Sequence, residues 1–241
     1  MAHPSEEGRV VTVVLSIMCA DGVVIAADSQ ITDSDRGMSF PGQKLHHLGD
    51  HAAWAGSGAR GVLTDIEKAL DATAQEVLAA DEVSHALQEL ALPILRRHYD
   101  LFISDIPGED SQGTPSAYLL AAGYSKGEPF IVEINPNGMV SHYEDIGFHA
   151  IGSGAPMAQQ AGVLLAHFRM VDRPVDYGVL GAVRVIEALS ITSPSVGLEI
   201  DVARITREGA HHLEEEEIDA VREDVKRWIK AEQELLDGLL A

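Results

Sequence analysis

The order of strand-like and helix-like segments constrains the fold of this 241-residue chain most strongly. Short apolar runs typical of strands are followed by a pair of amphipathic helices. This order then repeats before a last strand and a last helix. Paired helices between groups of strands fit two stacked sheets with helix layers outside them. We therefore expect an α+β protein, a four-layer αββα sandwich.

The expected elements follow from alternation in strands and a three-to-four-residue repeat in helices. We expect strands at residues 12–20, 22–28, 44–48, 51–56, 117–124, 130–134, 139–143, 148–151 and 200–205, and helices at residues 62–77, 83–95, 156–168, 175–189 and 214–240. Pro93 should kink or shorten the second helix. We divide the chain into an N-terminal extension (residues 1–11), the sandwich (12–209) and a C-terminal amphipathic helix (210–241). The apolar stripe of that helix predicts either a subunit contact or packing on the chain's own sandwich.

Charge and cysteine content narrow the classes of partner. The chain has 17 basic and 38 acidic residues and a formal net charge of −21. We therefore expect neither nucleic acid nor a membrane as a partner, since nucleic acid and anionic membrane surfaces attract basic proteins. The apolar stretch at residues 10–27 is interrupted by Asp21-Gly22, which predicts two strands joined by a turn and not a membrane span. The single cysteine, Cys19, excludes an internal disulfide, suits the cytoplasm, and should be inert on an apolar strand.

Three residues at the ends of these runs carry candidate chemistry. Asp28 and Lys44 follow Thr12 by 16 and 32 positions. A threonine that starts a chain is a nucleophile with its own base, because the α-amino group can accept the hydroxyl proton. A lysine nearby would lower the pKa of that amine by like-charge repulsion, and an aspartate would hold the lysine charged and in place.

The segments around these residues resemble a known family. Thr12-Val-Val, Asp21-Gly-Val-Val-Ile-Ala-Ala-Asp28-Ser and Gly42-Gln-Lys44-Leu are similar to the β-type proteasome subunits. These are N-terminal nucleophile (Ntn) hydrolases, a class that includes the bacterial HslV peptidase. The likeness extends to about Arg207 through further landmarks at Ala55-Gly56, Ile151-Gly-Ser153-Gly154 and Ile200-Asp-Val-Ala.

The resemblance implies a fold, an activity and an assembly. It implies the Ntn-type sandwich and a threonine peptidase that cleaves peptides or unfolded proteins without a metal or other cofactor. It also implies a homo-oligomeric ring, and leaves open an ATPase or α-type partner. Two alternatives remain: a catalytically silent structural or assembly subunit, and a related amidohydrolase or transpeptidase.

The resemblance also implies roles for particular residues. The catalytic positions are Thr12, Asp28, Lys44 and Ser153, and the substrate-binding positions are Thr32, Gly56, Ile31 and Trp54. Ser153 would bind the terminal amine, and the Gly56 N–H would stabilise the oxyanion, with Gly58 as a rival. Thr32 would align an extended substrate by strand addition, and Ile31, Gly42 and Trp54 would line a side-chain pocket. A structural ion pair is the alternative for Asp28 and Lys44, helix capping for Ser153, and a core position for Trp54.

The residue before the candidate nucleophile departs from the family pattern. Val11 stands where the family usually has glycine. Either the extension is cleaved after Val11, or translation starts at a GUG codon read here as Val10 or Val11 and the initiating methionine is removed. We favour the second explanation, because it needs no self-processing.

A second departure precedes the last strand. Aligned back from Ile200, the family's aspartate and serine fall at Ser193 and Val196. Ser195 could replace them only in part, so the support around the nucleophile is altered.

Other candidate sites are weaker. His46, His47, His51 and His211-His212 could suggest a metal, but adjacent strand residues point to opposite faces and do not readily share an ion. The glycine-rich stretch at residues 56–61 lacks the Lys-Ser/Thr ending of a phosphate loop.

Overall fold

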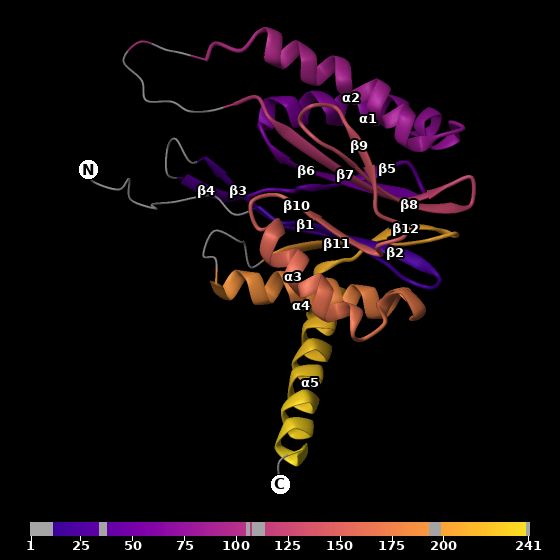
Figure 1. Ribbon diagram of the computed structural model, residues 1–241, viewed down its shortest axis with the longest axis vertical. Coiled ribbons are helices and arrows are strands. Elements are labelled where there is room, and N and C mark those ends of the chain that lie inside the picture. The colour runs from indigo at the N-terminus through magenta and orange to yellow at the C-terminus, as the bar shows by residue number, and fades with distance from the viewer. Residues whose placement is uncertain (1–11, 34–37, 105–106, 108–113, 193–198, 240–241) are drawn as a thin grey trace.

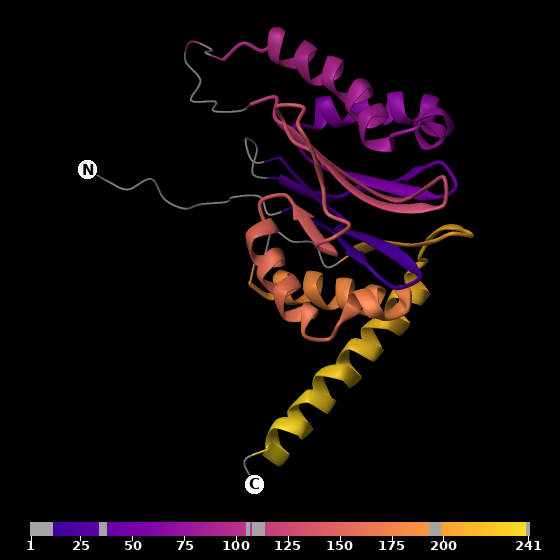
Figure 2. The ribbon, with the colours of Figure 1, turned by 45° about the vertical axis from the view of Figure 1, so that its right-hand side comes forward.

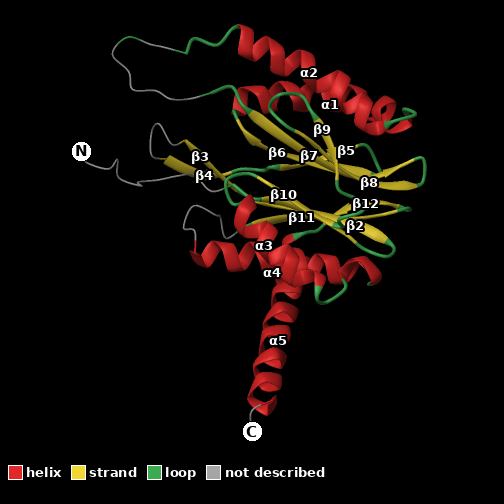
Figure 3. Ribbon diagram, viewed as in Figure 1, coloured by secondary structure: helices red, strands yellow, loops and turns green. Residues whose placement is uncertain are grey.

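The computed structural model describes residues 12–33, 38–104, 107, 114–192 and 199–239. Two five-stranded sheets stack face to face between two layers of helices (Figure 1, Figure 3). This is the expected αββα sandwich. Within the described ranges, no helix has both the length and the apolar composition needed to cross a bilayer.

The first sheet has the order β10-β1-β2-β11-β12, with every neighbouring pair antiparallel. Its strands are β1 (Val14–Met18), β2 (Gly22–Asp28), β10 (Phe148–Ile151), β11 (Ile200–Thr206) and β12 (Gly209–His212). β1 and β2 are buried along their whole length. This explains their continuous apolar sequence, because one face packs on helices and the other on the second sheet.

The second sheet has the order β5-β6-β7-β8-β9 and is also antiparallel. Its strands are β5 (Leu45–Leu48), β6 (Ala52–Gly58), β7 (Ala117–Ser125), β8 (Glu128–Ile134) and β9 (Val140–His142). A separate hairpin, β3 (Gln30–Asp33) and β4 (Met38–Pro41), extends beside the end of the sandwich (Figure 1).

Helices cover the outer face of each sheet. The helices are α1 (Arg60–Ala79), α2 (Val83–Asp100), α3 (Ala155–Ala166), the short 3-10 helix η1 (Met170–Asp172), α4 (Val175–Thr192) and α5 (Glu215–Leu239). α1 and α2 pack on the second sheet, and α3 and α4 on the first (Figure 1). α2 is not shortened at Pro93. Proline has no N–H to donate to the carbonyl four residues earlier. Because Pro93 is on the exposed side of α2, that carbonyl faces solvent and the helix continues.

α5 begins on the sandwich and then extends away from it (Figure 1, Figure 2). Ile218 and Val225 are buried, and Trp228 packs against the core between the first sheet and its helices. Packing on the chain's own sandwich therefore accounts for the first part of the stripe. The stripe continues through Leu235 and Leu239, which are 64% and 66% exposed.

β12 crosses the boundary that the sequence predicts between residues 209 and 210. It pairs with β11 from Ala203↔His212 to Thr206↔Gly209. The C-terminal segment therefore begins with a strand of the sandwich before the helix.

Candidate active site

Thr12 lies directly before β1, at the end of the sandwich where β1 and β2 are joined by their outermost hydrogen bond. The Asp28 N–H donates to the Val13 carbonyl at 3.2 Å. The Gly154 N–H donates to the Thr12 carbonyl at 3.0 Å. Thr12 is therefore held between β2 and the turn that follows β10, and its side chain is only partly buried.

Asp28 ends β2 and is fully buried. One carboxylate oxygen accepts the Val13 N–H at 2.9 Å, while the other accepts the Gln30 N–H at 3.3 Å and the Lys44 ammonium at 2.8 Å. A buried carboxylate is stable as an anion only when hydrogen bonds and a counter-charge replace its water. These three donors meet that need and fix the direction of the lysine.

Lys44 lies directly before β5 and brings its side chain from the second sheet to the first. Its Nζ is 3.4 Å from Thr12 Oγ1. Burial lowers the pKa of the Lys44 ammonium below its ordinary value, and the nearby charges of Asp28 and Asp201 oppose that shift. The structure thus brings Thr12, Asp28 and Lys44 together as the resemblance to the family implies.

The turn between β10 and α3 encloses the backbone of Thr12. The Thr12 N–H donates to Ser153 Oγ at 3.1 Å. Gly154 is the N-cap residue of α3, which has no side-chain cap hydrogen bond, so Ser153 is not the helix cap. Gly152 has φ +98°, and a Cβ there would lie 2.2 Å from the Thr12 carbonyl oxygen. Only glycine allows this close approach.

The expected substrate-binding residues lie on several elements and do not form one cluster like the catalytic residues. Ile31 packs on Gly42, since a Cβ on Gly42 would lie 2.2 Å from Ile31 Cδ1. Thr32 pairs with Ser39 in the β3–β4 hairpin, and its side chain is outside the described set. Gly56 lies in β6 facing α1, where a Cβ would meet Leu63.

Trp54 does not line a pocket, so this prediction is corrected. Its side chain is 1% exposed and belongs to the core between the second sheet and its helices. The reason is strand alternation: Ala53 and Ala55 of β6 face the first sheet, so Trp54 faces the helices. Its ring stacks on His46 at 4.7 Å between centroids.

The structure adds two polar residues that the sequence did not single out for function. Asp201 in β11 accepts the Lys44 backbone N–H at 3.5 Å. Ser57, on the face of β6 that carries Ala53 and Ala55, has its Oγ 3.3 Å from the point where a Gly152 Cβ would lie. Asp201 belongs to the family landmark Ile200-Asp-Val-Ala, but nothing in the sequence shows that its side chain contacts the residue before β5.

The histidines considered as metal ligands point in different directions. His46 stacks on Trp54 and pairs with Glu67 at 3.3 Å, whereas the His47 ring contacts the His212 ring in a tilted arrangement at 3.7 Å between centroids. The two neighbours thus face opposite sides of β5, as expected. Among the described residues, no group of three or more histidine, cysteine, aspartate and glutamate side chains could hold a metal ion.

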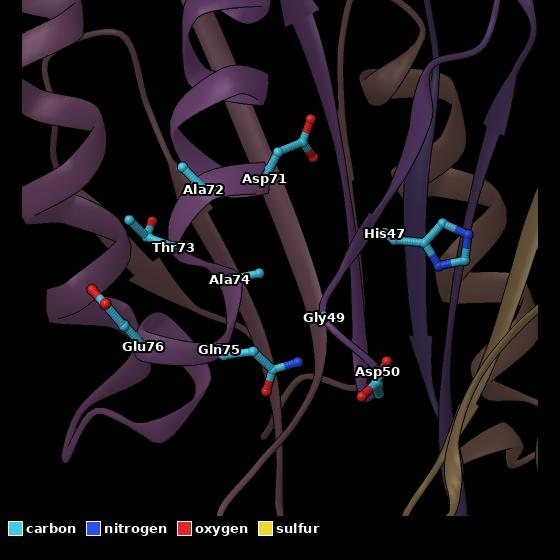
Figure 4. Close-up of a pocket in the computed structure, with 9 residues that line it drawn as sticks. All are labelled: His47, Gly49, Asp50, Asp71, Ala72, Thr73, Ala74, Gln75 and Glu76. Atoms are coloured by element: carbon cyan, nitrogen blue, oxygen red, sulfur yellow. The ribbon is translucent and has the colours of Figure 1, made fainter.

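A cavity of about 420 Å³ lies between the last residues of β5, the turn that follows it, and α1 (Figure 4). Its lining residues are His47, Gly49, Asp50 and residues 71–76 of α1. It contains none of the residues around Thr12 and is therefore separate from the candidate site.

Cys19 faces the helices that cover the first sheet and packs against α4 near Gly178. Burial raises the pKa of its thiol to about 12. The thiol is therefore protonated at neutral pH, which agrees with the inert role expected from the sequence.

Comparison with known proteins identifies the family. A match to the proteasome subunit family covers residues 11–203, most of the chain. The chain belongs to the proteasome subunit family. The match includes Thr12, Asp28, Lys44 and Ser153.

Individual relatives agree with this assignment. The chain is 31% identical to proteasome subunit beta 1 of Thermococcus kodakarensis over 212 residues, 88% of this chain and 97% of the relative. It is 29% identical to a proteasome subunit beta of Archaeoglobus profundus over 217 residues, 90% of this chain and 94% of the relative.

Solved structures show the same fold. Anbu (ancestral beta-subunit) from Yersinia bercovieri superposes with a TM-score of 0.70 at 19% identity, covering 94% of this chain and 96% of that one. The four-layer sandwich is therefore the proteasome-type Ntn-hydrolase fold. The departures at Val11 and at Ser193, Ser195 and Val196 lie outside the described residues.

Proposed function

We propose that this proteasome-family subunit is a threonine peptidase in which Thr12, once it is the first residue, attacks peptide bonds. The observation that carries the proposal is the position of the Lys44 ammonium, 2.8 Å from Asp28 and 3.4 Å from Thr12 Oγ1. A structural ion pair alone would not need the lysine beside a hydroxyl at the start of the matched domain.

The chemistry follows from these contacts. A free Thr12 amine has an ordinary pKa of about 7.7–8.0, and the neighbouring Lys44 charge lowers it, so the amine is neutral and basic near pH 7. It takes the proton from Oγ1 as that oxygen bonds to the substrate carbonyl carbon. The Gly56 N–H, or that of its rival Gly58, stabilises the oxyanion.

Collapse of the intermediate breaks the peptide C–N bond. The proton held by the Thr12 amine passes to the leaving nitrogen, and the acyl group remains as an ester on Oγ1. Water, deprotonated by the same amine, then hydrolyses the ester. Ser153 supports the amine, since its Oγ already lies 3.1 Å from the Thr12 nitrogen.

The proposal includes an assembly and a location. We place the subunit in a homo-oligomeric ring that encloses the exposed nucleophile and receives unfolded protein or peptides. Its single cysteine fits the reducing cytoplasm. An ATPase or α-type partner would supply substrate.

The test is cleavage of a panel of fluorogenic peptides, together with labelling by a threonine-directed epoxyketone. Protein whose chain begins at Thr12 should cleave and be labelled. Thr12→Ala should abolish both, and Lys44→Ala should slow cleavage by at least about 100-fold. Lys68→Ala is the matched control, because Lys68 is 73% exposed, lies on α1 and pairs there with Asp65.

One outcome would favour the silent subunit. If the chain begins at Thr12 and neither labels nor cleaves, the substitutions at Ser193 and Val196 have removed the support that the nucleophile needs. If labelling occurs without cleavage of longer peptides, the related amidohydrolase or transpeptidase activity becomes the better conclusion.

A further inference from the structure

Asp201 lies next to the candidate catalytic groups on a neighbouring strand. In the register of β2 and β11, Asp28 pairs with Ile200 and Asp201 pairs with Ala27. The two carboxylates therefore belong to adjacent positions at the same end of the first sheet. Asp201 is partly buried, whereas Asp28 is fully buried.

Lys44 is held at both ends by these two carboxylates. Asp28 binds the ammonium at 2.8 Å, and Asp201 Oδ2 accepts the backbone N–H of the same residue at 3.5 Å. The second hydrogen bond is long, but its acceptor is a carboxylate in a partly desolvated site, where charge strengthens it.

This contact crosses between the sheets. Asp201 belongs to β11 of the first sheet, while Lys44 leads into β5 of the second. The lysine must reach Thr12 from the opposite sheet, so a small shift at the start of β5 would move Nζ away from the hydroxyl. Displacements of about 1 Å can cost about 100-fold in rate.

We propose that Asp201 is a positioning residue that anchors the backbone of Lys44 and helps to keep its ammonium charged beside Thr12. The inference rests on the proposed peptidase function and extends it to a residue outside the catalytic group. Asp201 itself does not touch the reacting atoms.

The surrounding charges define the expected pH dependence. Lys44 faces Asp28 and Asp201, and Asp201 faces Lys44, His46 and Asp28. Burial raises the pKa of the Asp201 carboxyl. The Asp201 charge in turn raises the pKa of Lys44, so its removal should let the ammonium lose its proton at lower pH.

Two substitutions separate two effects of Asp201: the hydrogen bond that it accepts from the Lys44 N–H, and its charge. Asp201→Asn keeps an oxygen that can accept the Lys44 N–H but removes the charge. Asp201→Ala removes both. Asp176→Asn is the matched control. Asp176 is an exposed carboxylate of α4 that pairs at 2.9 Å with Arg204, a residue of the same strand as Asp201.

We expect Asp201→Asn to shift the alkaline limb of kcat to lower pH and Asp201→Ala to lower kcat about tenfold, both with little change in KM. The control should match the wild type. Wild-type kcat and pH limits in both Asp201 variants would overturn the proposal. So would a change in KM alone, or a loss of activity that only tracks thermal unfolding.

A second measurement keeps this test independent of peptidase activity. The Lys44 side-chain carbon next to Nζ can be titrated by NMR, assigned by the signal missing in Lys44→Ala. We expect a lower midpoint in Asp201→Asn than in the wild type or the control. An unchanged midpoint would overturn the role of Asp201 even in an active enzyme, whereas a lowered midpoint in an inactive protein would contradict only the proposed function.

Discussion

Replacing His212 with phenylalanine should remove a measurable part of the acid sensitivity of the fold. His212 lies on β12, an edge strand of the first sheet, and its ring contacts the tilted ring of His47 on β5, an edge strand of the second. Its Nε2 is buried with no hydrogen-bond partner among the described residues. In the described part of the chain, no acceptor therefore lies ready for a proton on Nε2.

The magnitude follows from the pKa of this ring. Burial, and then the neighbouring His47, His211 and His46, lower the pKa of His212 from 6.5 to about 4. In this interval the unfolded chain binds a proton that the folded chain does not, so stability is lost as the pH falls from 6.5 to 4. A full shift of this size corresponds to about 3.4 kcal/mol. Because solvent still reaches part of the ring, we expect about 1–2 kcal/mol.

The assay compares unfolding at pH 7 and pH 4.5 for wild type, His212→Phe and a control, His85→Phe. His85 is a good control because its side chain is 62% exposed. Between the two pH values the wild type and the control should lose about 1–2 kcal/mol more than His212→Phe, equivalent to about 2–8 °C in Tm. Protein concentration must be fixed, since assembly also changes apparent stability. Equal losses in all three proteins would refute the reasoning.

Two further substitutions probe the site and the C-terminal helix. Gly152→Ala should lower activity at least tenfold and stability by about 1–3 kcal/mol, because its Cβ would lie 2.2 Å from the carbonyl oxygen of the nucleophile. Gly127→Ala is its control, because Gly127 has a similar φ of +83° but no atom lies within 4 Å of the added Cβ among the described residues. Activity and Tm are measured for both variants, and activity should fall only in Gly152→Ala. Arg184→Ala should cost about 1–2 kcal/mol and speed hydrogen exchange in α5, because Arg184 binds Glu232 and lies 4.0 Å from the Trp228 ring centroid. Unchanged exchange would mean that α5 is held by apolar packing alone.

The layer order was predictable because hydrophobic periods report which face of an element is buried. The helix at 175–189 and the strand at 148–151 were found close to their observed bounds. The β3–β4 hairpin was not predicted, because each strand has only four residues and β3 contains a single apolar residue, Ile31. β12 was missed for a similar reason, since Gly209 and two histidines give little apolar signal.

The candidate site was predictable where two residues lie at the ends of strands that are joined by a short turn. Thr12 and Asp28 lie at the ends of the adjacent strands β1 and β2, so their positions in sequence imply their proximity. Lys44 comes from the second sheet, and its place beside them followed from the resemblance to the family. The orientation of Trp54 was not predictable, because the continuous apolar run at residues 52–55 hides which face each side chain occupies. The contact of Asp201 depends on how the two sheets stack, which no local pattern reports.

The mass of the native chain, taken from assembled protein before and after incubation with an epoxyketone, tests the central claim most directly. We expect a chain that begins at Thr12 and gains one inhibitor, with fragmentation placing the adduct on that residue. A native chain that still begins at Met1, or a free Thr12 that gains nothing, would contradict the account.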